Sequence, residues 1–106
     1  MRNVLIVILT LMLVVNSVYA KEVVVEIYKK AFIPKYLTIE VGDTVIWRNI
    51  EKRQYHNVWF KALLTEEPDY IFPNERYQLV FNNIGEFSYE CGPHPKMKGV
   101  VIVTKK

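Results

Sequence analysis

The chain has 106 residues, a formal net charge of +3 and 51% hydrophobic residues. This length allows one domain, and this hydrophobic content excludes intrinsic disorder for most of the chain. One cysteine and two histidines exclude an intramolecular disulfide framework and any zinc site built on several thiolates. Lysines and arginines form no dense run, so we predict no binding to nucleic acid.

The N-terminus has the pattern of a secretory signal. A basic start, an apolar stretch over residues 4–15 and a small-residue end make up residues 1–20. The apolar stretch is too short to span a bilayer comfortably. We therefore predict a signal peptide, cleavage between Ala20 and Lys21, and a periplasmic mature domain over residues 21–106 with no membrane attachment. The alternative is an uncleaved N-terminal anchor. Cleavage leaves 13 basic and 11 acidic side chains.

The rest of the chain is made of short segments with strand character, separated by turn residues. Seven such segments are predicted, over residues 22–28, 36–41, 44–49, 56–60, 77–81, 86–91 and 99–104. Residues 61–75 are less regular and contain at most a short helical turn over residues 63–67. No apolar stripe of helical period exceeds two turns, so the pattern predicts an all-β sandwich of about seven to eight strands.

Alternation along two of these segments indicates where the reactive side chains point, because alternate residues of a strand share a face. Cys91 shares its face with the apolar residues Phe87 and Tyr89. His56 lies on the apolar face of the segment 56–60. Both side chains are therefore predicted to point into the core.

Cys91 opens a compact loop in which every third residue is a soft or borderline metal ligand, since His94 and Met97 follow it at equal intervals. Two histidines and one cysteine with a weak axial methionine form the ligand set of blue-copper electron-transfer sites. We predict that His56, Cys91, His94 and Met97 bind one copper ion. Taken singly, each has a plainer interpretation, as a core cysteine, a buried histidine or a gap-filling methionine. Their combination favours copper.

Several stretches resemble the cupredoxins, the small blue copper proteins, which include amicyanins, pseudoazurins and plastocyanins. They are residues 32–39, the Val-Gly-Asp-Thr-Val-Ile-Trp-Arg-Asn sequence of residues 41–49, the pair His56-Asn57, and residues 85–100. The short Cys-to-Met loop is similar to that of amicyanins. The resemblance implies a Greek-key β-sandwich with copper at one end, and it implies that Asn57 joins the two ligand loops by hydrogen bonds.

The two prolines of the ligand loop have predicted roles. Pro93 and Pro95 fix backbone angles and so stiffen the loop. Pro95 has no N–H to donate to the Cys91 thiolate, and hydrogen bonding to that sulfur tunes the reduction potential. The resemblance implies a docking patch around His94, the predicted electron port. Its predicted members are Pro93, His94, Pro95, Lys96 and Lys98, with Lys52, Arg53 and Lys61 as further basic residues at its edge.

These features predict a periplasmic, non-enzymatic carrier of single electrons between redox partners. Four protein donors leave no open position at the metal for substrate chemistry. The candidate partners are an amine dehydrogenase, a c-type cytochrome, a copper nitrite reductase and a terminal oxidase, and the carrier itself is expected to be a monomer. A periplasmic copper-delivery protein is the first alternative, and a plain interaction domain without metal is the second.

Overall fold

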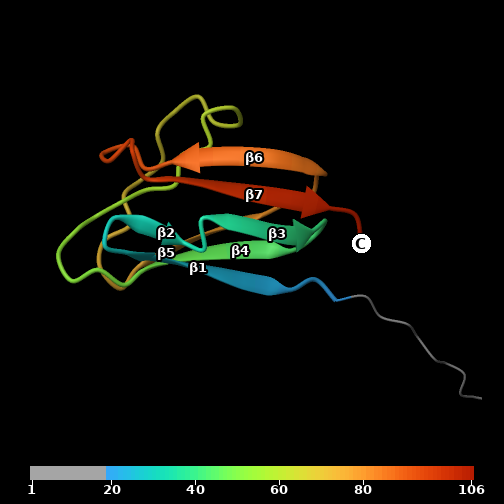
Figure 1. Ribbon diagram of the computed structural model, residues 1–106, viewed down its shortest axis with the longest axis horizontal. Coiled ribbons are helices and arrows are strands. Elements are labelled where there is room, and N and C mark those ends of the chain that lie inside the picture. The colour runs from blue at the N-terminus through green and yellow to red at the C-terminus, as the bar shows by residue number, and fades with distance from the viewer. Residues whose placement is uncertain (1–18) are drawn as a thin grey trace, which may run out of the picture.

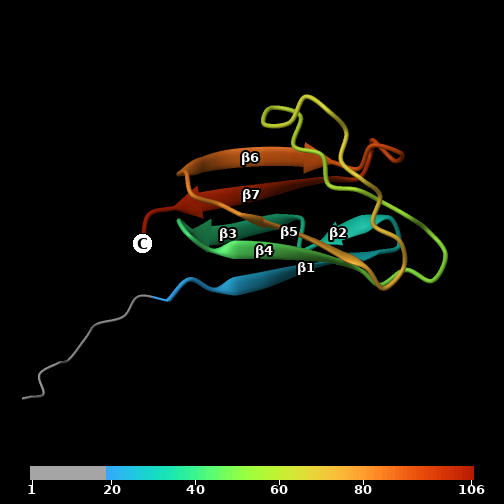
Figure 2. The same cartoon turned by 180° about the vertical axis from the view of Figure 1, so that it is seen from behind.

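The computed structural model describes residues 19–106, which contain seven strands and no helix. The strands form two packed sheets, in the orders β2-β1-β4-β5 and β3-β7-β6 (Figures 1 and 2). Their bounds are β1 (Glu22–Tyr28), β2 (Ala31–Ile33), β3 (Tyr36–Glu40), β4 (Thr44–Asn49), β5 (Arg76–Val80), β6 (Gly85–Glu90) and β7 (Lys98–Thr104). The predicted all-β sandwich is confirmed. The predicted signal peptide lies almost wholly outside the described residues, which contain no helix that could cross a membrane.

Parallel pairs join strands that are distant in the sequence. β1 pairs in parallel with β4, and β3 pairs in parallel with β7. The chain therefore passes repeatedly from one sheet to the other, as the Greek-key expectation requires. In consequence the loops that follow β4 and β6 lie at the same end of the sandwich, on the left in Figure 1.

Two of the predicted elements differ from the observed ones. Residues 56–60 form no strand and make only isolated bridges, through His56 to Ile71 and through Trp59 to Glu90. Strand alternation fails there because the consecutive side chains of His56 and Asn57 are both fully buried. The predicted helical turn lies earlier than expected: a single turn over residues 60–64, in which the N–H groups of Leu63 and Leu64 donate to the Phe60 carbonyl, stands in place of one over residues 63–67.

The strand β2 was not predicted from the sequence. It has only three residues and follows a tight turn in which Lys29 and Lys30 both have left-handed φ angles, of 52° and 54°. A lysine pair carries none of the usual glycine or asparagine signal for such a turn. The short hairpin of β1 and β2 was therefore not visible in the residue pattern.

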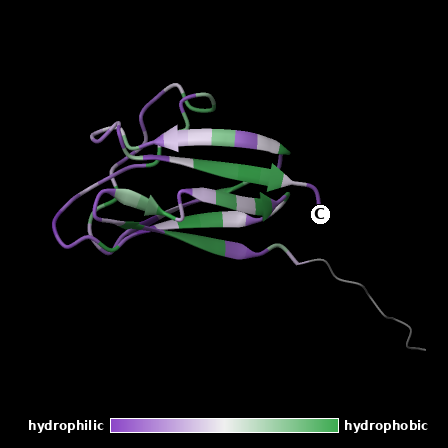
Figure 3. Cartoon of the chain, in the orientation of Figure 1, coloured by the Kyte–Doolittle hydropathy of each residue, from purple (hydrophilic) through white to green (hydrophobic). Residues whose placement is uncertain are grey.

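Aromatic and branched side chains from both sheets fill the space between them. Trp47 of β4 is fully buried, and its indole N–H donates to the Tyr89 hydroxyl of β6 at 3.1 Å. The Trp47 ring also packs edge-on against Phe60, with centroids 5.8 Å apart. The predicted inward positions of Tyr89 and Cys91 are confirmed, since both side chains are buried. Figure 3 shows this apolar character along β1 and β7.

The turn between β3 and β4 closes the opposite end of the sandwich. Gly42 adopts a φ of 96°, which favours glycine, and the following Asp43 is fully buried. Its two carboxylate oxygens accept the main-chain N–H groups of Lys21 and Glu40, at 2.9 and 3.0 Å. These two hydrogen bonds hold the pKa of Asp43 below its ordinary value. A single carboxylate thus joins the start of β1 to the end of β3.

Candidate metal centre

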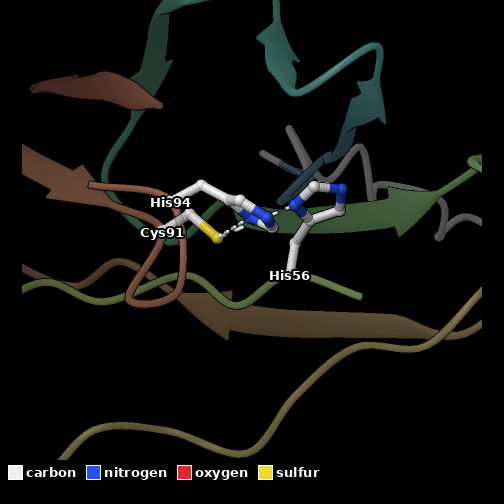
Figure 4. A group of neighbouring side chains, drawn as sticks. All are labelled: His56, Cys91 and His94. Carbon is white, nitrogen blue, oxygen red and sulfur yellow. Dashed lines mark hydrogen bonds between the residues drawn. The ribbon is translucent and has the colours of Figure 1, made fainter. Parts of the chain in front are cut away.

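Three side chains from two loops converge at the left end of the sandwich. His56 lies in the loop after β4, whereas Cys91 and His94 lie in the loop between β6 and β7. The Cys91 sulfur is 3.7 Å from His56 Nδ1 and 3.5 Å from His94 Nδ1, and all three ligand atoms lie within 4.8 Å of one another (Figure 4). Both imidazole rings therefore turn the same nitrogen toward the thiol.

These separations fit three ligands of one metal ion. Metal–sulfur bonds of about 2.3 Å and metal–nitrogen bonds of about 2.0 Å, at a trigonal angle of about 120°, place the two atoms about 3.7 Å apart. The observed distances from sulfur to nitrogen are 3.5 and 3.7 Å. The donor set of one thiolate and two imidazoles is the trigonal set of blue-copper sites.

The loop after β6 folds by two overlapping turns. The N–H of His94 donates to the Cys91 carbonyl at 3.1 Å, and the N–H of Met97 donates to the His94 carbonyl at 2.8 Å. Pro95 follows the first residue of the second turn, a position that its fixed φ favours. The Cys91 N–H then donates to the Met97 carbonyl at 3.1 Å, which closes the loop. Met97 is 5% exposed and therefore lies buried at the metal end.

Burial keeps His56 neutral. Loss of hydration lowers the pKa of His56, and the nearby His94 ring acts in the same direction. A neutral imidazole can offer the lone pair of Nδ1 to a metal ion. On the far side of the ring, Nε2 lies 3.6 Å from a carboxylate oxygen of Glu51 and has no hydrogen-bond partner among the described residues.

Glu51 faces the His56 ring from the same loop. Its Oε2 also accepts the main-chain N–H of Lys30 at 2.8 Å, which fixes the carboxylate in place. A carboxylate behind a histidine ligand sets which ring nitrogen carries the proton. Glu51 was not predicted from the sequence. It lies five residues before His56 in an irregular loop, where no strand or helix periodicity indicates which side chains meet.

Cys91 is fully buried, and loss of hydration raises the pKa of its thiol. The N–H groups of Asn57 and His94 oppose that shift only in part. The residue is therefore a neutral thiol in the metal-free protein. Since a metal binds the thiolate, loading the site releases this proton.

Asn57 joins the loops that carry the three donors. Its Oδ1 accepts the main-chain N–H of Gly92 at 2.7 Å. Its Nδ2 donates to Glu67 Oε2 at 2.8 Å and to the Pro68 carbonyl at 3.2 Å. One buried amide thus connects the first histidine, the loop after β6 and the irregular segment 61–75. The contact with that third segment was not predicted from the sequence.

The structure separates the predicted docking residues into two groups. A hollow of about 360 Å³ beside the site is lined by Lys30, His94, Pro95, Lys96 and Met97. Lys98 lies elsewhere: it and Lys61 donate to the Glu90 carboxylate, at 3.2 and 3.1 Å. The remaining predicted residues are Pro93, which is half-buried in the same loop, and Lys52 and Arg53, which are exposed in the loop before His56.

A β-sandwich that gathers two histidines and a cysteine at one end has the architecture of a cupredoxin. A sequence model of the copper-binding proteins of the plastocyanin/azurin family matches residues 19–104. The chain therefore belongs to this family, and its cofactor is copper.

Amicyanins stand out among the named relatives and the solved structures that resemble the chain. The chain is 39% identical over 91 residues to an amicyanin of Paracoccus versutus, a match that covers 82% of this chain and 68% of that protein. It is 39% identical over 85 residues to an amicyanin of Paracoccus denitrificans, with coverage of 76% and 64%. The structure of the Cu(I) form of a mutant amicyanin superposes with a TM-score of 0.74 at 35% identity, covering 82% and 86%. The chain thus spans about two thirds of the length of the relatives it matches.

Proposed function

We propose that this protein carries single electrons between redox partners through one copper ion held by His56, Cys91 and His94, with Met97 as the weak axial ligand. The observation that carries the proposal is the convergence of one sulfur and two Nδ1 atoms at 3.5 and 3.7 Å. Membership of the plastocyanin/azurin family supports the same function.

The residues of the site suit a fast one-electron exchange. Copper would supply the redox chemistry, by changing between Cu(II) and Cu(I). The thiolate of Cys91 and the thioether of Met97 are soft ligands that favour the reduced ion, whereas the two imidazoles accept either state. The turns of the loop after β6 and the link through Asn57 hold the ligand positions. A ligand cage that stays in place during the change of charge keeps the reorganisation energy small.

Electrons enter and leave through the His94 edge in this proposal. His94 is half-buried and lines the hollow together with Pro95 and Met97, whereas His56 is fully buried. Lys30 and Lys96 border the same hollow. The complementary partner is a redox protein with an acidic surface around its own redox centre, because opposite charges steer association. The carrier acts as a monomer and performs no substrate chemistry.

The proposed location is the periplasm, reached through the signal peptide of residues 1–20. The apolar stretch and small-residue end of that segment support export. Intact-mass analysis of the full-length chain expressed for export tests this location. A mass that begins at Lys21 is expected. A mass that retains residue 1 in a membrane fraction contradicts cleavage and supports an uncleaved anchor.

The first test is the visible absorption and EPR spectrum of the exported protein after one equivalent of Cu(II). An intense thiolate-to-copper band and narrow copper hyperfine splitting are expected. The Cys91→Ala variant is the matched control and loses both signals. A pale sample with ordinary tetragonal copper signals contradicts the proposal. Rapid transfer of copper from the loaded protein to a chelator contradicts electron transfer in favour of copper delivery.

A further inference from the structure

One carboxylate of the irregular segment 61–75 reaches the loop that carries Cys91. Glu67 Oε2 accepts Nδ2 of the buried Asn57 at 2.8 Å. The same oxygen lies against the backbone of Gly92, where a methyl group on that residue would overlap it. The φ angle of Gly92 is not in the left-handed region. Gly92 is therefore needed for the space it leaves and not for its backbone freedom.

A chain of hydrogen bonds runs from this carboxylate to the residue after the copper-binding thiol. Glu67 accepts from Asn57, and Asn57 in turn accepts the main-chain N–H of Gly92 at 2.7 Å. An ionised carboxylate can only accept and a main-chain N–H can only donate. The two ends of the chain therefore dictate which way the Asn57 amide faces. Without Glu67, only the Pro68 carbonyl remains to hold its Nδ2.

The carboxylate also places a negative charge one residue from Cys91. Glu67 is exposed, but its Oε2 faces Asn57 and Gly92, and Asn57 and the Cys91 thiol are fully buried. Protein rather than water therefore lies between this oxygen and the metal site. A negative charge stabilises the more positive of two charge states, and the attraction is stronger where water is excluded. The oxidised copper site carries one more positive charge than the reduced site.

We propose that Glu67 is a positioning residue that orients Asn57 and lowers the reduction potential of the copper site. In this proposal the absence of a side chain at Gly92 leaves the space that the Glu67 carboxylate occupies. This proposal rests on the proposed copper function. It assigns a role at the metal to a segment of the chain that contributes no ligand. The charge acts on the potential directly, and the hydrogen bond acts on the geometry of the ligand loop.

The charge is tested with Glu67→Gln in the copper-loaded protein. Glutamine keeps an oxygen that accepts from Asn57, so this variant removes the charge with the smallest change in geometry. Glu66→Gln is the matched control, because Glu66 has the same charge and is exposed like Glu67, whereas it is Glu67 whose carboxylate accepts from Asn57 and lies at Gly92. A redox titration is expected to give a higher potential for Glu67→Gln, and a clearly smaller shift for Glu66→Gln. Equal shifts, or no shift in either variant, overturn the charge role.

The positioning role is tested without copper, by hydrogen exchange of the Gly92 amide in the metal-free protein. Glu67→Ala removes the acceptor, so this amide is expected to exchange faster than in the parent, and Glu67→Gln is expected to restore slow exchange. Unchanged protection in Glu67→Ala overturns the positioning role. This measurement stands even if the parent protein fails to form a blue site, an outcome that refutes the proposed function separately.

Gly92→Ala provides the reciprocal test. The added methyl group is expected to displace the Glu67 carboxylate, and so to raise the potential and lower the thermal midpoint. In the Glu67→Ala background the overlap with the carboxylate is gone and the nearest remaining neighbour of the methyl group is Asn57 Nδ2 at 3.2 Å, so the same substitution is expected to change both quantities much less. Equal effects in the two backgrounds contradict a shared contact between these residues.

Discussion

The two ends of the sandwich hold their buried polar groups in different ways. At the end beside the β3–β4 turn, Asp43 is satisfied by the main-chain N–H groups of Lys21, just before β1, and of Glu40, the last residue of β3. At the loop end, the Cys91 sulfur lies 3.7 Å from His56 Nδ1 and 3.5 Å from His94 Nδ1. The turn end is complete as a folded structure, whereas the loop end gathers lone pairs that a metal ion satisfies.

The largest expected effect is that of removing copper, which should destabilise the loop end more than the turn end. Copper at about 1,000 times its Kd adds about 4 kcal/mol to the free energy of unfolding, which raises the Tm of a domain of this size by roughly 15–30 °C. Calorimetry of loaded and chelated protein measures the difference. Hydrogen exchange should slow at residues 91–97 more than at residues 40–44. Equal protection at both ends would show that the loop end is not specially dependent on the metal.

The next effect weakens the turn end alone. Asp43→Asn replaces one accepting oxygen by an amide donor that faces a main-chain N–H, which costs about 1–3 kcal/mol. Because the folded pKa of Asp43 is depressed, its contribution is present above the unfolded pKa and is lost as pH falls through the folded value. Urea unfolding should therefore show a gap between parent and variant at pH 7 that narrows toward pH 3. A changed copper spectrum in this variant would contradict the independence of the two ends.

A substitution in the ligand loop should change the potential more than the stability. Pro95→Ala adds a main-chain N–H to the ligand loop, which we expect to donate to the Cys91 thiolate, and a hydrogen bond to that sulfur withdraws electron density from the metal. The reduction potential is expected to rise, as voltammetry can measure. An unchanged or lower potential in Pro95→Ala contradicts this role of the proline.

The smallest effect concerns docking at the loop end. Lys96 borders the hollow beside His94, whereas Lys98 is paired with Glu90. Lys96→Gln is therefore expected to slow electron exchange with an acidic redox protein by a few fold at low salt, and Lys98→Gln to slow it less. Stopped-flow rates across a salt series measure both variants. A rate for the parent protein that does not depend on ionic strength refutes the basic docking surface.

The residue pattern predicted the features that depend on residues close together in the sequence. Alternation in β6 predicted the inward Cys91, and the equal spacing to His94 indicated the ligand loop. It could not predict that residues 56–60 are not a strand, because tertiary hydrogen bonds hold His56 and Asn57 there. Contacts made by isolated carboxylates in irregular loops depend on the path of the whole chain. The contacts of Glu51 and Glu67 were not predicted for that reason.

The hydrogen bond between Lys21 and Asp43 would change if the proposed signal peptide is removed. In the full-length chain the Lys21 nitrogen is an amide, and it donates to the buried carboxylate at 2.9 Å. Cleavage at the predicted position, after Ala20, converts this nitrogen into a terminal ammonium group. The hydrogen bond to the ionised carboxylate then gains a second charged partner and becomes an ion pair. Export would in this way tighten the turn end of the sandwich by the same proteolytic step that releases the protein.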